Sequence, residues 1–191
     1  MVNFFEITRS RLRQKVLSYF FTNPEANLYL REIASILKED PGNLSKELTK
    51  LEKEKIFNSL VKGNQKYFSL NKNYPLYKEL KSIIFKTIGV EGSLRQIMES
   101  LEGIKLSFIY GSFAKNRQNS ASDIDLLILG NPEEDKLNER IEDLEKRLQR
   151  EINYNIYSEE EYKKRIKKRD SFILNILKSP KIILKGKING I

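Results

Sequence analysis

The chain contains 191 residues, of which 35 are Lys or Arg and 26 are Asp or Glu, and its formal net charge is +9. It contains no Cys and no His, so disulfides, thiolate nucleophiles, Cys zinc sites and imidazole general bases are excluded. The positive charge favours an anionic partner such as a nucleic acid or a nucleotide, although an ordinary Lys-rich surface would give the same balance.

The longest apolar runs are much shorter than a membrane-spanning helix, and the N-terminus lacks the apolar core of a signal peptide. We therefore expect a cytoplasmic protein that does not insert into a membrane. The length is sufficient for one large domain or two small ones.

The first third of the chain has the pattern of short helices followed by a hairpin. Apolar side chains recur at helical spacing in three segments, and Asp40-Pro41 supplies an N-cap and a first helical residue for the third of them. Two apolar runs then flank Lys62-Gly63-Asn64-Gln65, which predicts a basic hairpin or wing. The predicted helices cover residues 8–21, 30–37 and 42–55, and the predicted strands cover residues 56–61 and 67–70.

The stretch LREIASILKEDPGNLSKELTKLEKEKIFNSLVKGNQKYFSL resembles the winged helix-turn-helix domains of small prokaryotic regulators, over roughly residues 8–72. One departure is Lys55, because many relatives have Gly at the turn into the wing. The resemblance implies that the helix at residues 42–55 enters the major groove of DNA. The residues expected to reach bases or phosphates are Asn43, Ser45, Lys46 and Lys50, with Lys62 and Lys66 contacting phosphates from the wing.

The charge of this expected DNA surface is moderate. Residues 43–66 contain six Lys and three Glu, a net charge of +3, and Glu47, Glu52 and Glu54 would weaken the attraction to phosphate. An alternative is that the winged helix serves dimerisation or contact with another protein. A homodimer is expected only by analogy with other winged-helix regulators.

Two further helices are predicted between this domain and the rest of the chain. They cover residues 76–87 and 94–101, and Gly89 and Gly92 are expected to mark a break between them.

Two short, β-branched and aromatic runs at residues 106–110 and 124–129 predict buried strands. The loop between them begins with Gly111-Ser112, and the second strand carries Asp123 and Asp125. Residues two apart on a strand project from the same face, so the two carboxylates should lie together. Their mutual repulsion would be relieved by a cation, and hard oxygen ligands suit Mg²⁺ that is shared with substrate phosphates.

Gly111 allows the backbone to approach a ligand closely, and the Ser112 hydroxyl lies beside exposed N–H groups, a combination that can cradle phosphate. The stretch FIYGSFAKN…SDIDLLILG resembles the nucleotidyltransferase fold of the DNA polymerase β superfamily, and in particular the minimal nucleotidyltransferases of bacteria and archaea. The resemblance implies that Gly111 and Ser112 hold the triphosphate of an NTP, and that Asp123 and Asp125 bind Mg²⁺ or Mn²⁺. Lys115 stands where the family often has a basic residue, and it could touch phosphate.

The resemblance also implies a third carboxylate on the strand after the next helix. The sequence predicts that helix at residues 133–150 and that strand at residues 152–157, and the third position falls at Asn153, or less readily at Asn155. Three explanations remain: Glu151 or Glu160 replaces the missing carboxylate, the site binds NTP or Mg²⁺ without efficient turnover, or an acceptor or partner completes it. The chain then continues with a helix at residues 159–177, capped by Ser158 and broken near residue 170, and a strand at residues 181–184.

The sequence therefore predicts an α+β protein with an N-terminal winged helix-turn-helix domain at residues 1–74, connecting helices at residues 75–103 and a nucleotidyltransferase-type mixed sheet with flanking helices at residues 104–191. The first functional hypothesis is a Mg²⁺-dependent nucleotidyltransferase that also binds DNA. Its acceptor would be a small molecule, a nucleic acid or a protein hydroxyl, such as that of a toxin partner. The second hypothesis is a DNA-binding transcriptional regulator whose nucleotidyltransferase domain only binds nucleotide or mediates assembly.

Overall fold

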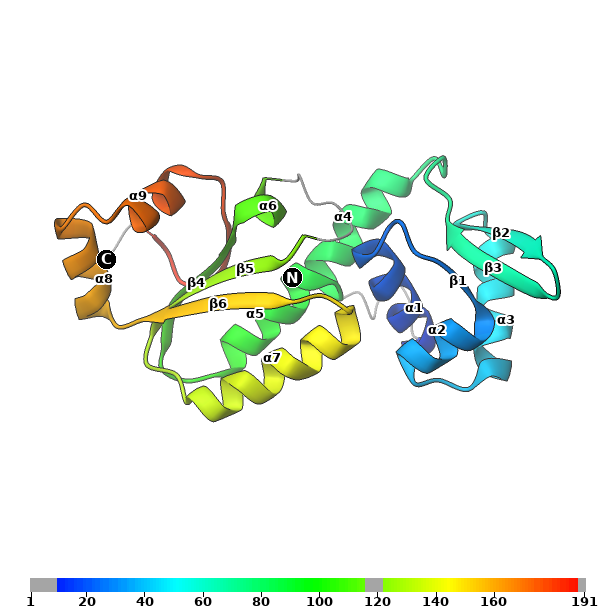
Figure 1. The fold of residues 1–191 in the computed structure, drawn as a ribbon, viewed down its shortest axis with the longest axis horizontal. Coiled ribbons are helices and arrows are strands. Elements are labelled where there is room, and N and C mark those ends of the chain that lie inside the picture. Colours follow the sequence, from blue (N-terminus) through cyan, green and yellow to red (C-terminus); the bar gives the residue numbers. More distant parts are fainter. Residues whose placement is uncertain (1–9, 116–121, 189–191) are drawn as a thin grey trace. The chain divides into compact units, whose positions relative to one another are not determined.

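The computed structural model describes residues 10–115 and 122–188 and divides into two compact units, Met1–Gly92 and Ser93–Ile191. The predicted α+β class is confirmed, with an N-terminal winged helix and a C-terminal mixed sheet (Figure 1). The first unit contains α1 (Arg11–Thr22), β1 (Asn27–Tyr29), α2 (Leu30–Leu37), α3 (Pro41–Lys53), β2 (Phe57–Lys62), β3 (Gln65–Leu70) and α4 (Tyr77–Thr87). None of the helices in the described ranges is both long enough and apolar enough to cross a membrane.

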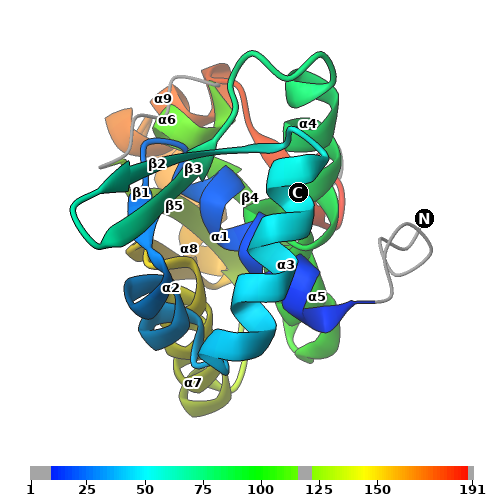
Figure 2. The same ribbon diagram turned by 90° about the vertical axis from the view of Figure 1, so that its right-hand side faces the viewer.

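The helix α3 begins where the sequence predicts. The Asp40 side chain accepts a hydrogen bond of 2.8 Å from the backbone N–H of Asn43, and Pro41 occupies the first turn. Its apolar stripe of Leu44, Leu48 and Leu51 is fully buried in the core of this unit, which gives α3 a fixed orientation with its polar face outward. Figure 2 shows α3 on the side of this unit that faces the viewer.

The wing is an antiparallel sheet with the strand order β1-β3-β2. The three-residue strand β1 is too short to give a pattern in the sequence, and we did not predict it. Lys62 pairs with Gln65, so the hairpin turn consists of Gly63 and Asn64 only and is tighter than the predicted loop. Lys55, at the turn into β2, has a φ of 59°, a left-handed conformation that explains why Gly is common at this position in the resembling family.

The helix after α4 starts earlier than predicted. It is α5 (Val90–Ser100), and it includes Gly92, which the sequence analysis had placed in a break. A Cβ atom on Gly92 would lie 1.9 Å from the backbone oxygen of Thr87. The absence of a side chain therefore lets α5 begin directly against the end of α4, and this glycine permits a close approach instead of ending a helix.

The second unit is built on a four-stranded sheet with the order β6-β5-β4-β7, in which β5 and β6 are parallel and the other pairs are antiparallel. The predicted mixed sheet is therefore confirmed. Its elements after α5 are β4 (Ile104–Tyr110), α6 (Gly111–Ala114), β5 (Ile124–Gly130), α7 (Glu134–Leu148), β6 (Ile152–Tyr157), α8 (Glu159–Lys167), α9 (Ser171–Lys178) and β7 (Ile182–Lys185).

Different helices pack on the two faces of this sheet. Figure 1 shows α5 and α7 along one face, and α6 and α9 on the other side of the sheet. On the second face, side chains of β4 and β5 such as Phe108 and Leu127 form a core with Tyr162 of α8 and Ile173 and Ile176 of α9. Asp125 precedes Leu127 by two residues on β5 and so belongs to this same face.

Candidate active site

The strand β4 ends at Tyr110, and the chain turns at Gly111 into the one-turn helix α6. Gly111 has a φ of 73°, and a Cβ atom built on it would lie 2.1 Å from Oδ2 of Asp125. Only glycine satisfies both the backbone conformation and the close approach. The structure thus brings the predicted Gly111-Ser112 pair directly against one of the two predicted aspartates. The helix α6 itself was not predicted, because four residues are too few to show a periodicity.

Asp123 immediately precedes β5 and is exposed, whereas Asp125 lies in β5 and is half-buried. Burial of the Asp125 carboxyl raises its pKa, and repulsion from the Asp123 carboxylate raises it further. The two carboxylates therefore interact electrostatically, as their spacing predicts. A divalent cation would remove both the repulsion and the cost of desolvating Asp125, so the pair fits a Mg²⁺ or Mn²⁺ site.

The strand β6 brings amides to this pair instead of a third carboxylate. Asn153 is paired with Asp125 in the parallel register, and its Nδ2 donates a hydrogen bond of 3.3 Å to Oδ2 of Asp123. Nδ2 of Asn155 donates a hydrogen bond of 3.3 Å to the Tyr110 hydroxyl. Asn153 is thus the residue that lies beside both aspartates, and its amide supports Asp123 without adding negative charge.

The two glutamates considered as replacements do not complete the site. Glu160 lines a cavity of about 720 Å³ together with Gly130 and Lys105, at the opposite end of β5 from Asp123. Glu151 precedes β6, but among residues 10–115 and 122–188 no group of three or more acidic side chains could hold a metal ion. Neither glutamate is grouped with Asp123 and Asp125 in this structure.

A buried arginine near the site was missed in the sequence analysis. Arg150 is only 7% exposed; its Nη1 donates a hydrogen bond of 2.8 Å to the backbone oxygen of Ser122, and its guanidinium lies 5.8 Å from the ring centroid of Phe113. Burial lowers its pKa, and the nearby Asp123 opposes that shift. Arg150 therefore connects α6 to the start of β5 and places a positive charge near the aspartates. In sequence it is one of several basic residues at the end of a charged helix, so no local pattern distinguishes it.

Lys115 lies at the C-terminal end of α6 and is exposed, and its backbone N–H donates to the oxygen of Gly111. The residues between Lys115 and Ser122 lie outside the described ranges. The phosphate contact of Lys115 stays a prediction.

The glutamates of the expected DNA surface have basic partners within the first unit. Arg13 of α1 contacts Glu47 at 2.5 Å and Glu54 at 2.9 Å, and Lys66 contacts Glu52 at 2.6 Å. The ammonium group of Lys66 is thus already bound to a carboxylate, so a phosphate contact by Lys66 would require an exchange of partners.

The outer face of α3 carries most of the predicted DNA-contacting residues. Asn43, Lys46 and Lys50 are exposed and Ser45 is half-buried. Lys62 lies in the wing, with its Nζ 5.5 Å from the ring centroid of Tyr67. The structure brings these side chains to two adjoining surfaces, the outer face of α3 and the wing.

A cavity of about 430 Å³ lies between α3 and the wing and is lined by Ser45, Asn64 and Lys66, among others. Arg31, at the start of α2, also lines it. The sequence analysis did not select Arg31, because it belongs to the helix before α3.

The fold and the site together define a winged-helix protein that carries a nucleotidyltransferase-type sheet. Residues 92–183 match the family described as the nucleotidyltransferase domain. This part of the chain is therefore similar to nucleotidyltransferase domains, in agreement with the motifs of the sequence. Comparison with curated proteins found no match.

Several solved structures resemble parts of the chain. MepR, a transcription regulator of the Staphylococcus aureus multidrug efflux pump MepA, shares 20% identity with a TM-score of 0.36; the match covers 43% of this chain and 62% of MepR, which is less than two thirds of that protein. Reduced HlyU from Vibrio cholerae shares 19% identity with a TM-score of 0.33, and the match covers 41% of this chain and 75% of HlyU. A toxin-antitoxin structure with AMP-PNP shares 15% identity with a TM-score of 0.38, and the match covers 52% of this chain and 75% of that one.

Replacement of Gly111 by Ala should displace the Asp125 carboxylate, because the new Cβ would lie 2.1 Å from Oδ2. Gly63 is a matched control: its φ of 58° is similar, but no atom lies within 4 Å of its hypothetical Cβ. Backbone strain of about 1–2 kcal/mol is therefore common to both variants. We expect Gly111→Ala to weaken Mn²⁺ binding in titration calorimetry by about 10- to 100-fold, while Gly63→Ala leaves it unchanged. Equal affinities in the two variants would contradict the contact.

Proposed function

We propose that this protein is a Mg²⁺-dependent nucleotidyltransferase that transfers NMP from an NTP to a hydroxyl acceptor, and that its winged helix binds DNA. The observation that carries the first part is the approach of the Gly111 backbone to the Asp125 carboxylate, since a Cβ there would lie 2.1 Å from Oδ2. Because of this contact, the turn and the carboxylate belong to one site. The turn would cradle phosphate, and the carboxylate would bind the metal ion.

Each residue of the proposed site would have a separate role. Asp123 and Asp125 would hold Mg²⁺ or Mn²⁺ together with phosphate oxygens, and the bound ion would neutralise negative charge on the phosphates and on the leaving group. Gly111, Ser112 and Lys115 would bind the triphosphate. Because Asn153 donates to Oδ2 of Asp123, it would keep that carboxylate oriented toward the shared ligand.

In the proposed reaction the acceptor oxygen forms a bond to the α-phosphorus, and the bond between that phosphorus and the bridging oxygen of the β-phosphate breaks. Pyrophosphate leaves with the bonding electrons. The acceptor proton passes to water or to a carboxylate, since the chain contains no His. The protein contributes mainly position and charge, which the turn and the two aspartates can supply.

A second candidate function is favoured by the amides of β6. Asn153 lies where the resembling superfamily has a carboxylate, and an amide can neither act as a base nor add charge for a second cation. On this reading the domain binds nucleotide with weak or no turnover, and the protein is a DNA-binding regulator whose sheet domain senses nucleotide or mediates assembly.

The first function is tested by transfer of label from each α-labelled NTP in the presence of Mg²⁺ or Mn²⁺. Candidate acceptors are small-molecule hydroxyls, nucleic acid ends and a protein hydroxyl such as that of a toxin partner. We expect Asp123→Ala/Asp125→Ala to abolish transfer, because both proposed metal ligands are removed. If wild type and the double variant gave the same signal, the enzyme assignment would be refuted.

Restoring a carboxylate at residue 153 separates the two candidate functions. Asn153→Asp places a third acidic side chain beside Asp123 and Asp125, so we expect the Mn²⁺ stoichiometry, measured by calorimetry with an NTP present, to rise from one to two. If the wild type is an active enzyme that works with an amide here, the added charge should change its transfer rate modestly. A transfer signal that appears only in Asn153→Asp would support the regulator, and an unchanged stoichiometry would show that residue 153 does not face the metal site. Asn155→Asp tests the alternative position, because Asn155 hydrogen-bonds to Tyr110 and not to Asp123.

The proposal that the winged helix binds DNA is supported by the charge of α3. With Glu47 and Glu54 engaged by Arg13, the exposed face is dominated by Lys46 and Lys50, neither of which has a carboxylate partner among the described residues. A helix with small, polar and basic residues outward and an apolar stripe inward is suited to the major groove.

Replacement of both lysines, Lys46→Ala/Lys50→Ala, should weaken binding to duplex DNA of mixed sequence. If each lysine neutralises one phosphate, the slope of the logarithm of the association constant against that of salt concentration should fall in magnitude by about 0.9 per lysine. Fluorescence anisotropy titrations at several salt concentrations measure both. Lys167→Ala/Lys168→Ala, on exposed residues at the end of α8, makes the same change in net charge. A loss of affinity as large in that control would contradict the assignment of α3 to the groove.

A further inference from the structure

Phe172, in the first turn of α9, has an unusual degree of exposure. Ile173 and Ile176 of α9 are buried against the sheet and Leu174 and Leu177 are partly buried, but Phe172 is 40% exposed. It is one of the few large hydrophobic side chains in the described ranges with this exposure. A ring that packs on one side and faces solvent on the other leaves room for a flat ligand on its free surface.

The position of Phe172 relates it to the candidate active site. Its ring stands edge-to-face against Tyr110, with 6.0 Å between the ring centroids and 85° between the planes. Tyr110 immediately precedes Gly111 in the chain, and it is paired with Asp125 across β4 and β5. Phe172 is therefore separated by one aromatic ring from both the proposed phosphate cradle and the proposed metal ligand.

The core that α8 and α9 form with this face of the sheet ends near Tyr110 and Asp125. On β5, Leu129 and Leu127 are fully buried in that core and Asp125 is half-buried, and Asp123, directly before β5, is exposed. Phe172 lies at the margin of the same core, beside Tyr110, which is itself only partly buried. A ligand whose phosphates lay at Gly111 would extend from the aspartates across Tyr110 toward this ring.

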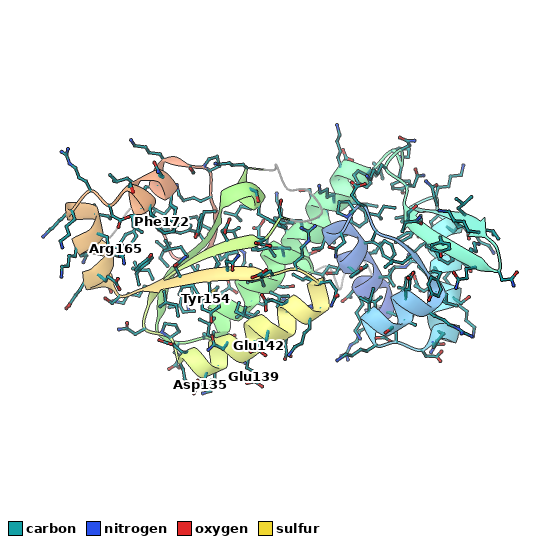
Figure 3. All side chains as sticks on the ribbon, viewed as in Figure 1. Asp135, Glu139, Glu142, Tyr154, Arg165 and Phe172 are labelled. Carbon is teal, nitrogen blue, oxygen red and sulfur yellow. The ribbon has the colours of Figure 1, made fainter. Side chains whose placement is uncertain are left out.

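The backbone that carries Phe172 is held in place by hydrogen bonds. Oδ1 of Asp170 accepts from the backbone N–H groups of Phe172 at 3.0 Å and of Ile173 at 3.1 Å. Arg165 of α8 donates to Oδ2 of Asp170 at 3.0 Å, and its guanidinium lies 4.8 Å from the ring centroid of Tyr157. Figure 3 shows Arg165 and Phe172 projecting from the neighbouring helices α8 and α9. The ring is therefore presented on an ordered support, which reduces the entropy that binding would cost.

We propose that Phe172 is the surface on which the base of the bound nucleotide stacks. The inference rests on the proposed function, because it takes the triphosphate to lie at Gly111-Ser112. Stacking on an aromatic ring accepts any base, since every base has a π-face. The ring therefore contributes to the affinity for all four NTPs and adds nothing to the affinity for tripolyphosphate, which has no base.

The test compares binding of the four NTPs and of tripolyphosphate, each with Mg²⁺, to the full chain by calorimetry. We expect Phe172→Ala to weaken NTP binding by about 5- to 150-fold and to leave tripolyphosphate binding unchanged, while Phe172→Tyr retains the wild-type affinity for NTPs. Circular dichroism and thermal melting of each variant exclude a general loss of structure. Unchanged NTP affinity in Phe172→Ala, or an equal loss for tripolyphosphate, would overturn the proposal.

A fluorescence measurement tests the stacking without comparing the affinities of variants. The chain contains no Trp, so Phe172→Trp introduces a single Trp at the proposed stacking position, which can be excited selectively over the Tyr residues. Its emission should be quenched by each NTP but not by tripolyphosphate. Tyr154 provides the control, because it projects from the opposite face of β6 and donates a hydrogen bond to Asn138 of α7 (Figure 3). A Trp at residue 154 should not respond to NTPs. Equal responses at the two positions, or none at residue 172, would overturn the proposal. If wild type binds neither NTPs nor tripolyphosphate, the proposed function itself fails.

Discussion

The close approach between the Gly111 backbone and the Asp125 carboxylate is the constraint on which the candidate active site depends. It requires a residue without a side chain at the end of β4, and it requires the carboxylate to stay at the edge of the core, where its pKa is raised. Antiparallel pairing of β4 with β5 keeps these groups together, because Tyr110 is held opposite Asp125. A local turn and a sheet register thus combine to place the Gly111 backbone beside an acidic pair.

Most of this site could be predicted from the sequence because its signals are local. Short apolar runs predict the strands, and the spacing of Asp123 and Asp125 predicts that both side chains lie on the same face. Asn153 lies beside Asp125 because β5 and β6 are neighbours in parallel register. Strand order and register are tertiary features. The sequence indicated Asn153 only through a family resemblance, and it could not indicate that the amide would donate to Asp123. Arg150 escaped notice because its burial depends on contacts with Ser122 and Phe113.

In the winged helix, the count of charged residues does not reveal which of them form ion pairs. The sequence shows three glutamates among the lysines of residues 43–66 and therefore a modest charge. Glu47 in α3 and Glu54 directly after it lie seven residues apart, about two helical turns, so a single arginine from α1 can contact both. Arg13 is more than thirty residues away in the chain, and no local pattern pairs it with them. These carboxylates stabilise the packing of α1 on α3 and leave the lysines to set the charge of the outer face.

The charge balance around the aspartates favours coupled binding of metal and nucleotide. Two carboxylates face the proposed metal position, a buried arginine lies nearby, and the remaining neighbours from β6 are neutral amides. A divalent cation bound by Asp123 and Asp125 alone would have few protein ligands, and the positive charge of Arg150 would oppose it. The oxygens of a triphosphate would supply both the missing ligands and the missing negative charge. Because such coupling is reciprocal, the cation would strengthen nucleotide binding by the same factor. An amide in place of a third carboxylate would therefore make occupancy of the proposed metal position depend on the nucleotide.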